Sequence, residues 1–132
     1  GLINDISLRN LHSVELAKGF GFLQSKPSSA LAPVFVTPDE LTSIWDGFKL
    51  NAQIEIKLNG QWFGSLSTGN NLQFNFPELI TYASKTRHLT AGTLIGSGTV
   101  SNENLSAGFG CILEKRCLEQ QKASDVLTPF LK

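Results

Sequence analysis

The clearest hydrophobic pattern in the chain is a strict alternation of apolar and polar residues over positions 52–58, followed by a second segment at 61–66. A period of two places one face of a strand against a core and leaves the other face in water. Asn59-Gly60 separates the two segments, and this pair suits the type I′ turn of a two-residue hairpin loop. The pattern therefore predicts a β-hairpin over residues 52–66.

Two stretches carry the signals of a helix start. Thr37-Pro38-Asp39-Glu40 combines an N-cap residue, a proline at the first helical position and a glutamate three residues after the cap, which predicts a short helix to about Trp45. Asn75-Phe76-Pro77-Glu78 has the same arrangement and predicts a helix to about Thr86. A polar helical segment is also expected near residues 118–121.

Several shorter apolar runs, at 2–8, 34–36, 94–100 and 108–114, predict further strands, the first of them buried. Residues 10–29 contain glycine and proline breakers and no clean period, so they predict a long ordered loop, and such loops are usually functional. No internal repeat or linker interrupts the chain. These elements predict one β-rich α+β domain over residues 1–132 with a few short helices.

Composition narrows the class of protein. The 132 residues include 11 basic and 11 acidic side chains, so the net charge is zero and no basic surface for nucleic acid is expected. No run of about 18 apolar residues predicts a membrane span, and no N-terminal signal is evident. Two cysteines are too few for a disulfide framework or a zinc site, which favours a reducing cytoplasm. Because the chain begins at Gly1 and contains no methionine, we expect a piece of a longer polypeptide.

Three residues near the N-terminus are candidates for chemistry. Asp5 lies in an apolar run, where an unpaired carboxylate would cost several kcal/mol, so it is either held by a cation and donors or is a turn residue. Arg9 suits an ion pair or an anionic ligand, although a lone arginine is more often a surface residue. Lys26 suits a carboxylate or an enolate, although a solvated loop lysine has the same sequence appearance.

Later candidates also have two interpretations. Gly96-Ser97-Gly98-Thr99 indicates either a strand end where the backbone approaches a ligand or a bulge. Glu114 follows three apolar residues and is either part of a surface ion-pair cluster or an inward carboxylate that orients a catalytic base. The two histidines, His12 and His88, lack zinc-site spacing, and no Gly-x-Ser-x-Gly elbow is present.

Five blocks of sequence carry a family pattern: Asn4-Asp5-Ile6-Ser7-Leu8-Arg9, Lys18-Gly19-Phe20-Gly21-Phe22-Leu23-Gln24-Ser25-Lys26-Pro27, Pro33-Val34-Phe35-Val36-Thr37-Pro38-Asp39-Glu40-Leu41, Leu79-Ile80-Thr81-Tyr82-Ala83-Ser84-Lys85-Thr86 and Gly92-Thr93-Leu94-Ile95-Gly96-Ser97-Gly98-Thr99. In this order they resemble the fumarylacetoacetate hydrolase family, and in particular a bacterial branch of its C-terminal catalytic domain. The likeness covers nearly the whole chain.

The resemblance implies a mainly β, mixed β-sandwich roll that carries a divalent metal ion held by carboxylates. Mg²⁺ is the expected ion, with Ca²⁺ or Mn²⁺ as alternatives. The family cleaves, decarboxylates, hydrates or isomerises β-dicarbonyl acids, and its name-giving members hydrolyse fumarylacetoacetate to fumarate and acetoacetate in tyrosine breakdown. The metal acts as a Lewis acid on the substrate oxygens. Homodimers are usual, and Trp62-Phe63 could supply an apolar contact.

The same resemblance assigns roles to individual residues. Asp5 matches a metal-ligand aspartate, Arg9 matches an arginine that contacts substrate, and Lys26 matches an active-site lysine. Thr99 matches a threonine that holds the carboxylate end of the substrate. Glu114 resembles the glutamate that orients a water-activating histidine in hydrolytic members, once one residue is inserted between Thr99 and Glu114.

The chain also departs from the family pattern. His12 stands where many members have a substrate-binding glutamine, which makes His12 a candidate substrate-binding residue and leaves substrate choice open. The other metal carboxylates and the catalytic histidine of the family lie upstream of the matching segment. We therefore expect residues 1–132 to be a C-terminal catalytic fragment that binds metal poorly and is inactive alone.

Three hypotheses follow. The first is metal-dependent hydrolysis of a carbon–carbon bond in a small diketo acid, fumarylacetoacetate or an acylpyruvate. The second is decarboxylation, hydration or isomerisation of related keto acids. The third is a non-catalytic β-rich binding or assembly domain, and the presence together of Asp5, Arg9, Lys26 and Thr99 argues against it.

Overall fold

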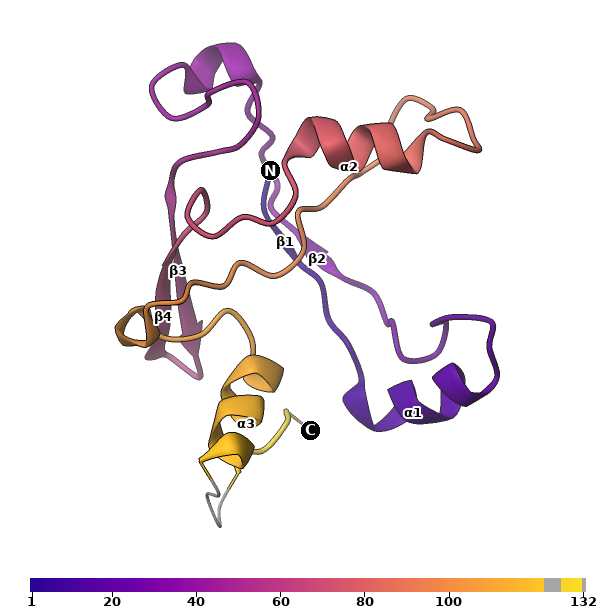
Figure 1. Cartoon of the computed structure of the whole chain (residues 1–132), viewed down its shortest axis with the longest axis vertical. Helices are drawn as coiled ribbons and strands as arrows, with labels where there is room; N and C mark the ends of the chain where they lie inside the picture. The colour runs from indigo at the N-terminus through magenta and orange to yellow at the C-terminus, as the bar shows by residue number, and fades with distance from the viewer. Residues whose placement is uncertain (123–126, 132) are drawn as a thin grey trace. The chain divides into compact units, whose positions relative to one another are not determined.

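The computed structural model of the chain describes residues 1–122 and 127–131. It forms two compact units, here called unit one (Gly1–Glu40) and unit two (Leu41–Lys132). Figure 1 traces the helices and strands of each unit. The α+β class is confirmed, but the described residues hold more α-helix than strand, so the mainly β composition that we expected is not observed.

Unit one contains a short antiparallel pair of strands and one helix. Strand β1 (Ile3–Asn4) pairs with β2 (Ala30–Leu31), with Ile3 opposite Leu31. The predicted buried strand over 2–8 is wrong beyond these two residues, because β1 is exposed and has only the two-residue β2 as a partner. The strand predicted at 34–36 is absent as well, and β2 lies upstream of it.

Helix α1 (Arg9–Ala17) occupies the segment that was predicted to be a loop. The prediction failed because the breakers that suggested a loop, Gly19, Gly21 and Pro27, all follow the end of the helix. Residues 9–17 contain neither glycine nor proline and suit a helix, but the breakers later in the 10–29 segment hid this pattern. The loop is therefore shorter and begins after Ala17.

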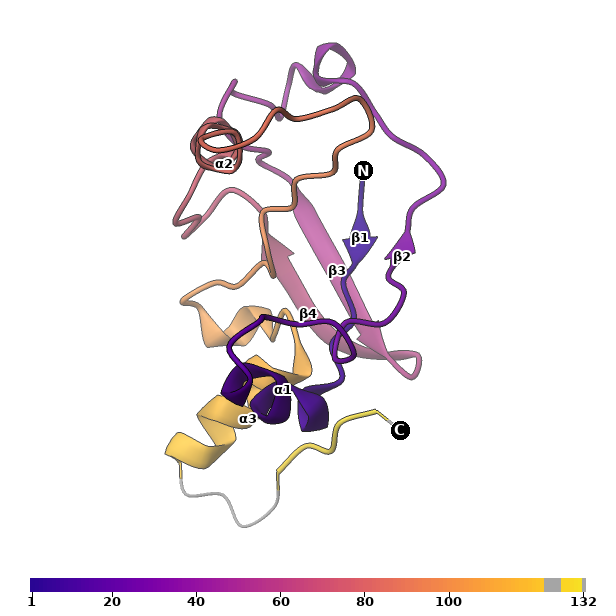
Figure 2. The same cartoon turned by 90° about the vertical axis from the view of Figure 1, so that its right-hand side faces the viewer.

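The predicted hairpin in unit two is confirmed. Strand β3 (Gln53–Leu58) pairs antiparallel with β4 (Gln61–Ser67), and the two run side by side in Figure 2. Asn59 and Gly60 have φ values of 51° and 80°, the positive values that a type I′ turn needs at both central residues. Side chains along β3 alternate between exposed and half-buried, as the period of two predicts.

The second predicted helix is also confirmed, although it ends earlier than Thr86. Helix α2 (Phe76–Ala83) begins with a complete capping box: the Glu78 N–H donates to Asn75 Oδ1 at 2.9 Å, and the Asn75 N–H donates to Glu78 Oε2 at 2.8 Å. The helix predicted from Thr37 to Trp45 is reduced to a 3₁₀ turn, η1 (Pro38–Leu41). The backbone N–H groups of Ile44 and Trp45 both donate to the carbonyl of Leu41, and residues 42–44 form a turn after η1 rather than a longer helix.

Two strands predicted in unit two are wrong. Residues 94–100 form no strand, because Gly98 takes a φ of 82° that interrupts the extended backbone. Within residues 108–114, the only strand-like pairing is an isolated bridge between Gly108 and Gly64. Helix α3 (Ile112–Gln121) then begins after Cys111, whose Sγ accepts the Glu114 N–H at 3.5 Å, so the polar helix expected near 118–121 starts earlier. A second 3₁₀ turn, η2 (Leu105–Ala107), precedes the bridge.

The apolar core of the described residues lies on β4. Phe63 and Leu66 are its buried apolar side chains, and the ring of Phe63 lies 6.0 Å from that of Phe109. The backbone of Phe109 packs directly over Gly64, and its N–H donates to the Phe63 carbonyl at 3.1 Å. Among the described residues, no helix has the length and apolar character that crossing a lipid bilayer requires.

Candidate functional site

Unit one brings the predicted residues Asp5 and Lys26 into direct contact. Lys26 Nζ lies 2.7 Å from Asp5 Oδ1 and donates to Ser7 Oγ at 3.0 Å. Ser29 Oγ donates to the same Asp5 oxygen at 3.1 Å. The Asp5 and Lys26 side chains are 60% and 31% exposed, so both charged groups are open to a ligand.

The strand pair accounts for part of this arrangement. Asn4 lies opposite Ala30, so the residues just outside the ladder, Asp5 and Ser29, emerge at the same end of it. The hydrogen bond from Lys26 lowers the pKa of Asp5, burial opposes this shift, and the Ser29 hydroxyl adds to it. Asp5 is therefore an ionised carboxylate, which resolves the sequence alternative in favour of an acid held by a cation and a donor.

A residue that the sequence reasoning did not assign to the site, Glu15, is the buried carboxylate of unit one. Its side chain accepts the backbone N–H groups of Leu23, Gln24 and Ser25 and the hydroxyl of Ser25. The Ser25 hydroxyl contributes most to the pKa shift, burial opposes it, and the three N–H groups add to it, so the pKa of Glu15 falls to about 2. A sequence signal exists: Arg9, His12 and Glu15 recur every three residues, which places them on one face of a helix.

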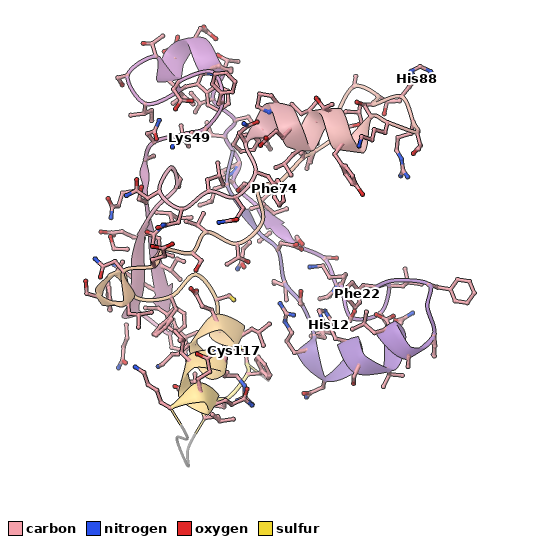
Figure 3. The ribbon with its side chains drawn as sticks, viewed as in Figure 1. His12, Phe22, Lys49, Phe74, His88 and Cys117 are labelled. Atoms are coloured by element: carbon pink, nitrogen blue, oxygen red, sulfur yellow. The ribbon has the colours of Figure 1, made fainter. Side chains whose placement is uncertain are left out.

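Arg9 and His12 contact each other on α1. The Arg9 guanidinium donates to His12 Nδ1 at 3.3 Å, so a neutral imidazole carries its proton on Nε2. His12 stacks on Phe22 with ring centroids 4.3 Å apart. Figure 3 labels both side chains. Within the part of the chain that the structure describes, His12 Nε2 is buried without a hydrogen-bond partner. A buried donor without a partner is rare in folded proteins, and a ligand oxygen is one group that would satisfy it.

Thr99 and Glu114 belong to unit two. Thr99 helps to line a shallow hollow with Asn70, Phe74 and Ser101. Glu114 lies in the first turn of α3, not on a strand, and its carboxylate accepts the Ser101 hydroxyl and, at 2.7 Å, the Gly110 N–H. The Glu114 carboxylate thus links the segment at Ser101 to the segment at Gly110, and both segments lie next to Thr99.

The other residues considered for metal or redox chemistry lie elsewhere. His88 is exposed and follows α2, as Figure 3 shows. Cys111 caps α3, and Cys117 is exposed on the same helix; both thiols are free. Trp62 is exposed, whereas Phe63 is buried in the core, so the hairpin offers only one of its two adjacent aromatic side chains to a partner.

The described residues do not by themselves fit a complete divalent metal site. Among them, no three His, Cys, Asp or Glu side chains lie close enough together to hold a metal ion. Asp5 can supply one anionic oxygen, but its Oδ1 already contacts an ammonium and a hydroxyl. Divalent cations of the Mg²⁺ and Ca²⁺ type take six or more oxygen ligands, about two of them carboxylates in many sites.

A search of curated proteins found no match. The family model described as fumarylacetoacetate (FAA) hydrolase C-terminal matches residues 1–127, a range that includes Asp5, Arg9, Lys26, Thr99 and Glu114. This match covers far more than half of the chain, and the chain therefore belongs to the fumarylacetoacetate hydrolase family.

Proposed function

We propose that this protein hydrolyses a carbon–carbon bond in a small β-diketo acid, fumarylacetoacetate or a related acylpyruvate, within the breakdown of tyrosine or other aromatic compounds. Membership of the family supports an enzyme of the hydrolase or decarboxylase type. The observation that carries the proposal is the contact of Lys26 Nζ with Asp5 at 2.7 Å, in a cluster that is accessible to a small anionic ligand.

The proposed reaction determines what Lys26 does. Hydroxide adds to one carbonyl carbon, the bond to the neighbouring carbon breaks, and the electron pair of that bond passes to an enolate, which a proton then converts to the ketone. The other half of the substrate leaves as a carboxylate. Lys26 stabilises the oxygen on which negative charge develops, because an ammonium that is already oriented needs little reorganisation during the step. Asp5 and Ser7 provide this orientation.

We propose that Arg9, His12 and Thr99 select the substrate. The Arg9 guanidinium suits a substrate carboxylate. The buried His12 Nε2 offers a donor to a carbonyl or carboxylate oxygen. Thr99 offers a hydroxyl at the edge of a hollow of unit two. Each of these groups is a hydrogen-bonding group of the kind that binds a carboxylate or carbonyl oxygen.

Divalent metal ions are typical of this family, and we propose Mg²⁺ with Asp5 as one ligand. Bound there, the ion would act as a Lewis acid. The remaining ligands would have to be carboxylates that unit one does not place beside Asp5. We also propose the single-domain β-sandwich roll, the homodimer and the cytoplasmic location that the resemblance implies.

Lys26→Met tests the proposed role in the native enzyme. The substitution keeps most of the aliphatic stem and removes the ammonium, so we expect kcat for diketo-acid cleavage to fall by about 10²-fold or more. Lys57→Met, on an exposed position of β3, is the matched control and should leave kcat unchanged. Cleavage by the Lys26 variant at the unmodified rate would contradict the proposal.

A second function in the same family, decarboxylation or isomerisation of a keto acid, is favoured by the surroundings of Glu114. Both oxygens of Glu114 are engaged by Ser101 and Gly110, which leaves them less free to orient a water-activating base. Glu114→Gln separates the two functions. Loss of hydrolysis with the fold retained supports a role in water activation, whereas unchanged turnover favours decarboxylation or isomerisation.

A further inference from the structure

We propose that Glu15 is a positioning residue, which holds the backbone turn at residues 23–26 so that the Lys26 ammonium meets Asp5. The proposal rests on the function proposed above for Lys26. Glu15 lies on α1, and its carboxylate bonds to residues 23–25 and to neither Asp5 nor Lys26, so it acts through the turn.

The first step is the geometry of the Glu15 carboxylate. Oε1 accepts the Gln24 N–H at 2.6 Å, and Oε2 accepts the Ser25 N–H at 3.0 Å and the Ser25 hydroxyl at 2.5 Å. The Leu23 N–H is shared by both oxygens at 3.2 and 3.1 Å. Glu15 is only 9% exposed and Ser25 is fully buried. Three successive N–H groups that converge on one anion form a site that a neutral side chain satisfies poorly.

The second step connects this site to Lys26. The Lys26 N–H donates to the Leu23 carbonyl at 3.3 Å, which closes the turn between the residues that Glu15 holds. The Ser25 carbonyl accepts the Leu8 N–H at 2.8 Å. Leu8 directly follows Ser7, which receives a hydrogen bond from Lys26 Nζ. The turn is thus fixed on one side by Glu15 and on the other by the segment that carries Asp5 and Ser7.

The third step is the freedom of the loop without Glu15. Gly19 and Gly21 both take positive φ values, and a Cβ at either position would meet no atom within 4 Å. Glycines in open surroundings restrain the backbone little. The carboxylate therefore supplies the main polar restraint that the structure shows for the turn, and its loss should move Lys26.

Glu15→Gln tests the inference because it keeps the size of the side chain and removes its charge. Glu119→Gln is the matched control: Glu119 accepts the N–H of Thr128 at 2.7 Å and its hydroxyl at 2.6 Å, the same pattern in unit two. We expect amide hydrogen exchange at residues 23–25 to accelerate about tenfold or more in Glu15→Gln and to stay unchanged there in the control.

The second readout follows Lys26 itself. Acylation by acetic anhydride, followed by peptide mass spectrometry, compares the rate at Lys26 with that at the exposed Lys57 of the same molecule. Release from Asp5 should raise the relative rate at Lys26 in Glu15→Gln but not in Glu119→Gln. In the native enzyme, kcat should fall by about 10²-fold with KM little changed, the scale of a misplacement of about 1 Å.

Ser25→Ala keeps the inference testable if Glu15→Gln fails to fold. This variant removes one of the four donor groups and leaves the three N–H groups in place. The faster exchange at residues 23–25, the faster acylation of Lys26 and the lower kcat should therefore all appear in weaker form. Unchanged exchange at residues 23–25, or faster exchange with unchanged Lys26 labelling, would overturn the inference. Absence of turnover in the unmodified enzyme would count against the proposed function alone, because exchange and labelling decide the position of Lys26 without it.

Discussion

Glu15 shows how one buried carboxylate links stability to pH. Its pKa falls from 4.5 to about 2 in the folded chain, chiefly because the Ser25 hydroxyl and nearby backbone N–H groups bind the ionised form. A lowered folded-state pKa stabilises the fold above pH 4.5, and that stabilisation is lost as pH falls from 4.5 toward 2. We expect the urea midpoint of unfolding, followed by circular dichroism, to decrease over this interval.

The same titration in Glu15→Gln should show a shallower decrease, because the substituted side chain does not titrate. The decrease should not vanish, since hydrogen bonds also lower the pKa values of Asp46 and Glu119. If the urea midpoint fell equally steeply with pH in the two proteins, Glu15 would not be ionised preferentially in the folded state.

At the scale of single elements, α2 depends on its capping box. Asn75→Ala removes the side-chain acceptor for the Glu78 N–H and leaves that donor without its partner. We expect a loss of about 1 kcal/mol in the free energy of unfolding, measured by urea denaturation. Gln73→Ala, an exposed position just before the helix, should change the stability by less than about 0.5 kcal/mol.

The packing of β4 is a second feature of this scale. A Cβ at Gly64 would lie 2.6 Å from the Phe109 carbonyl oxygen and 2.9 Å from its nitrogen, both backbone atoms that cannot rotate away. We therefore expect Gly64→Ala to destabilise the chain by about 1–3 kcal/mol in urea denaturation.

Gly96→Ala is the control for that substitution. A Cβ at Gly96 would meet only the Gly98 nitrogen, at 3.9 Å, so its stability should change by less than about 1 kcal/mol. Equal effects of the two substitutions would mean that contact with the Phe109 backbone does not limit the residue at position 64.

At the scale of the whole molecule, the set of charged groups determines how the chain binds metal. The described residues offer no group of three ligands, so calorimetric titration of the 132-residue chain with Mg²⁺ or Mn²⁺ at neutral pH should show no binding or binding in about the millimolar range. In the native enzyme, a loss of Mg²⁺ affinity in Asp5→Asn is the complementary expectation.

Micromolar binding by the 132-residue chain, lost in Asp5→Asn, would contradict this expectation. It would mean that residues 1–132 complete the site, and Glu15→Gln and Glu114→Gln would then identify further ligands. Ser7→Ala is a matched control for Asp5→Asn, because it removes another polar contact of Lys26 without removing a carboxylate.

The elements that could be predicted from sequence are those whose determinants lie within a few residues. Asn59-Gly60 specifies its turn because both residues accept positive φ, and Asn75 caps α2 through a residue three positions away. The segments 94–100 and 108–114 were mispredicted because an apolar run becomes a strand only if another strand pairs with it. Helix α1 was missed because the breakers beyond Ala17 obscured its short pattern.

For the site, sequence by itself determined the family and the candidate residues, since these depend on residue type and order. Only the tertiary structure decided which of them meet. The contact of Lys26 with Asp5, and the four donor groups on Glu15, join residues that are distant along the chain, and no local preference encodes such contacts. They form when β1 pairs with β2 and the turn at residues 23–26 packs on α1, which closes the intervening loops. The entropy cost of ordering those loops is then shared by many interactions.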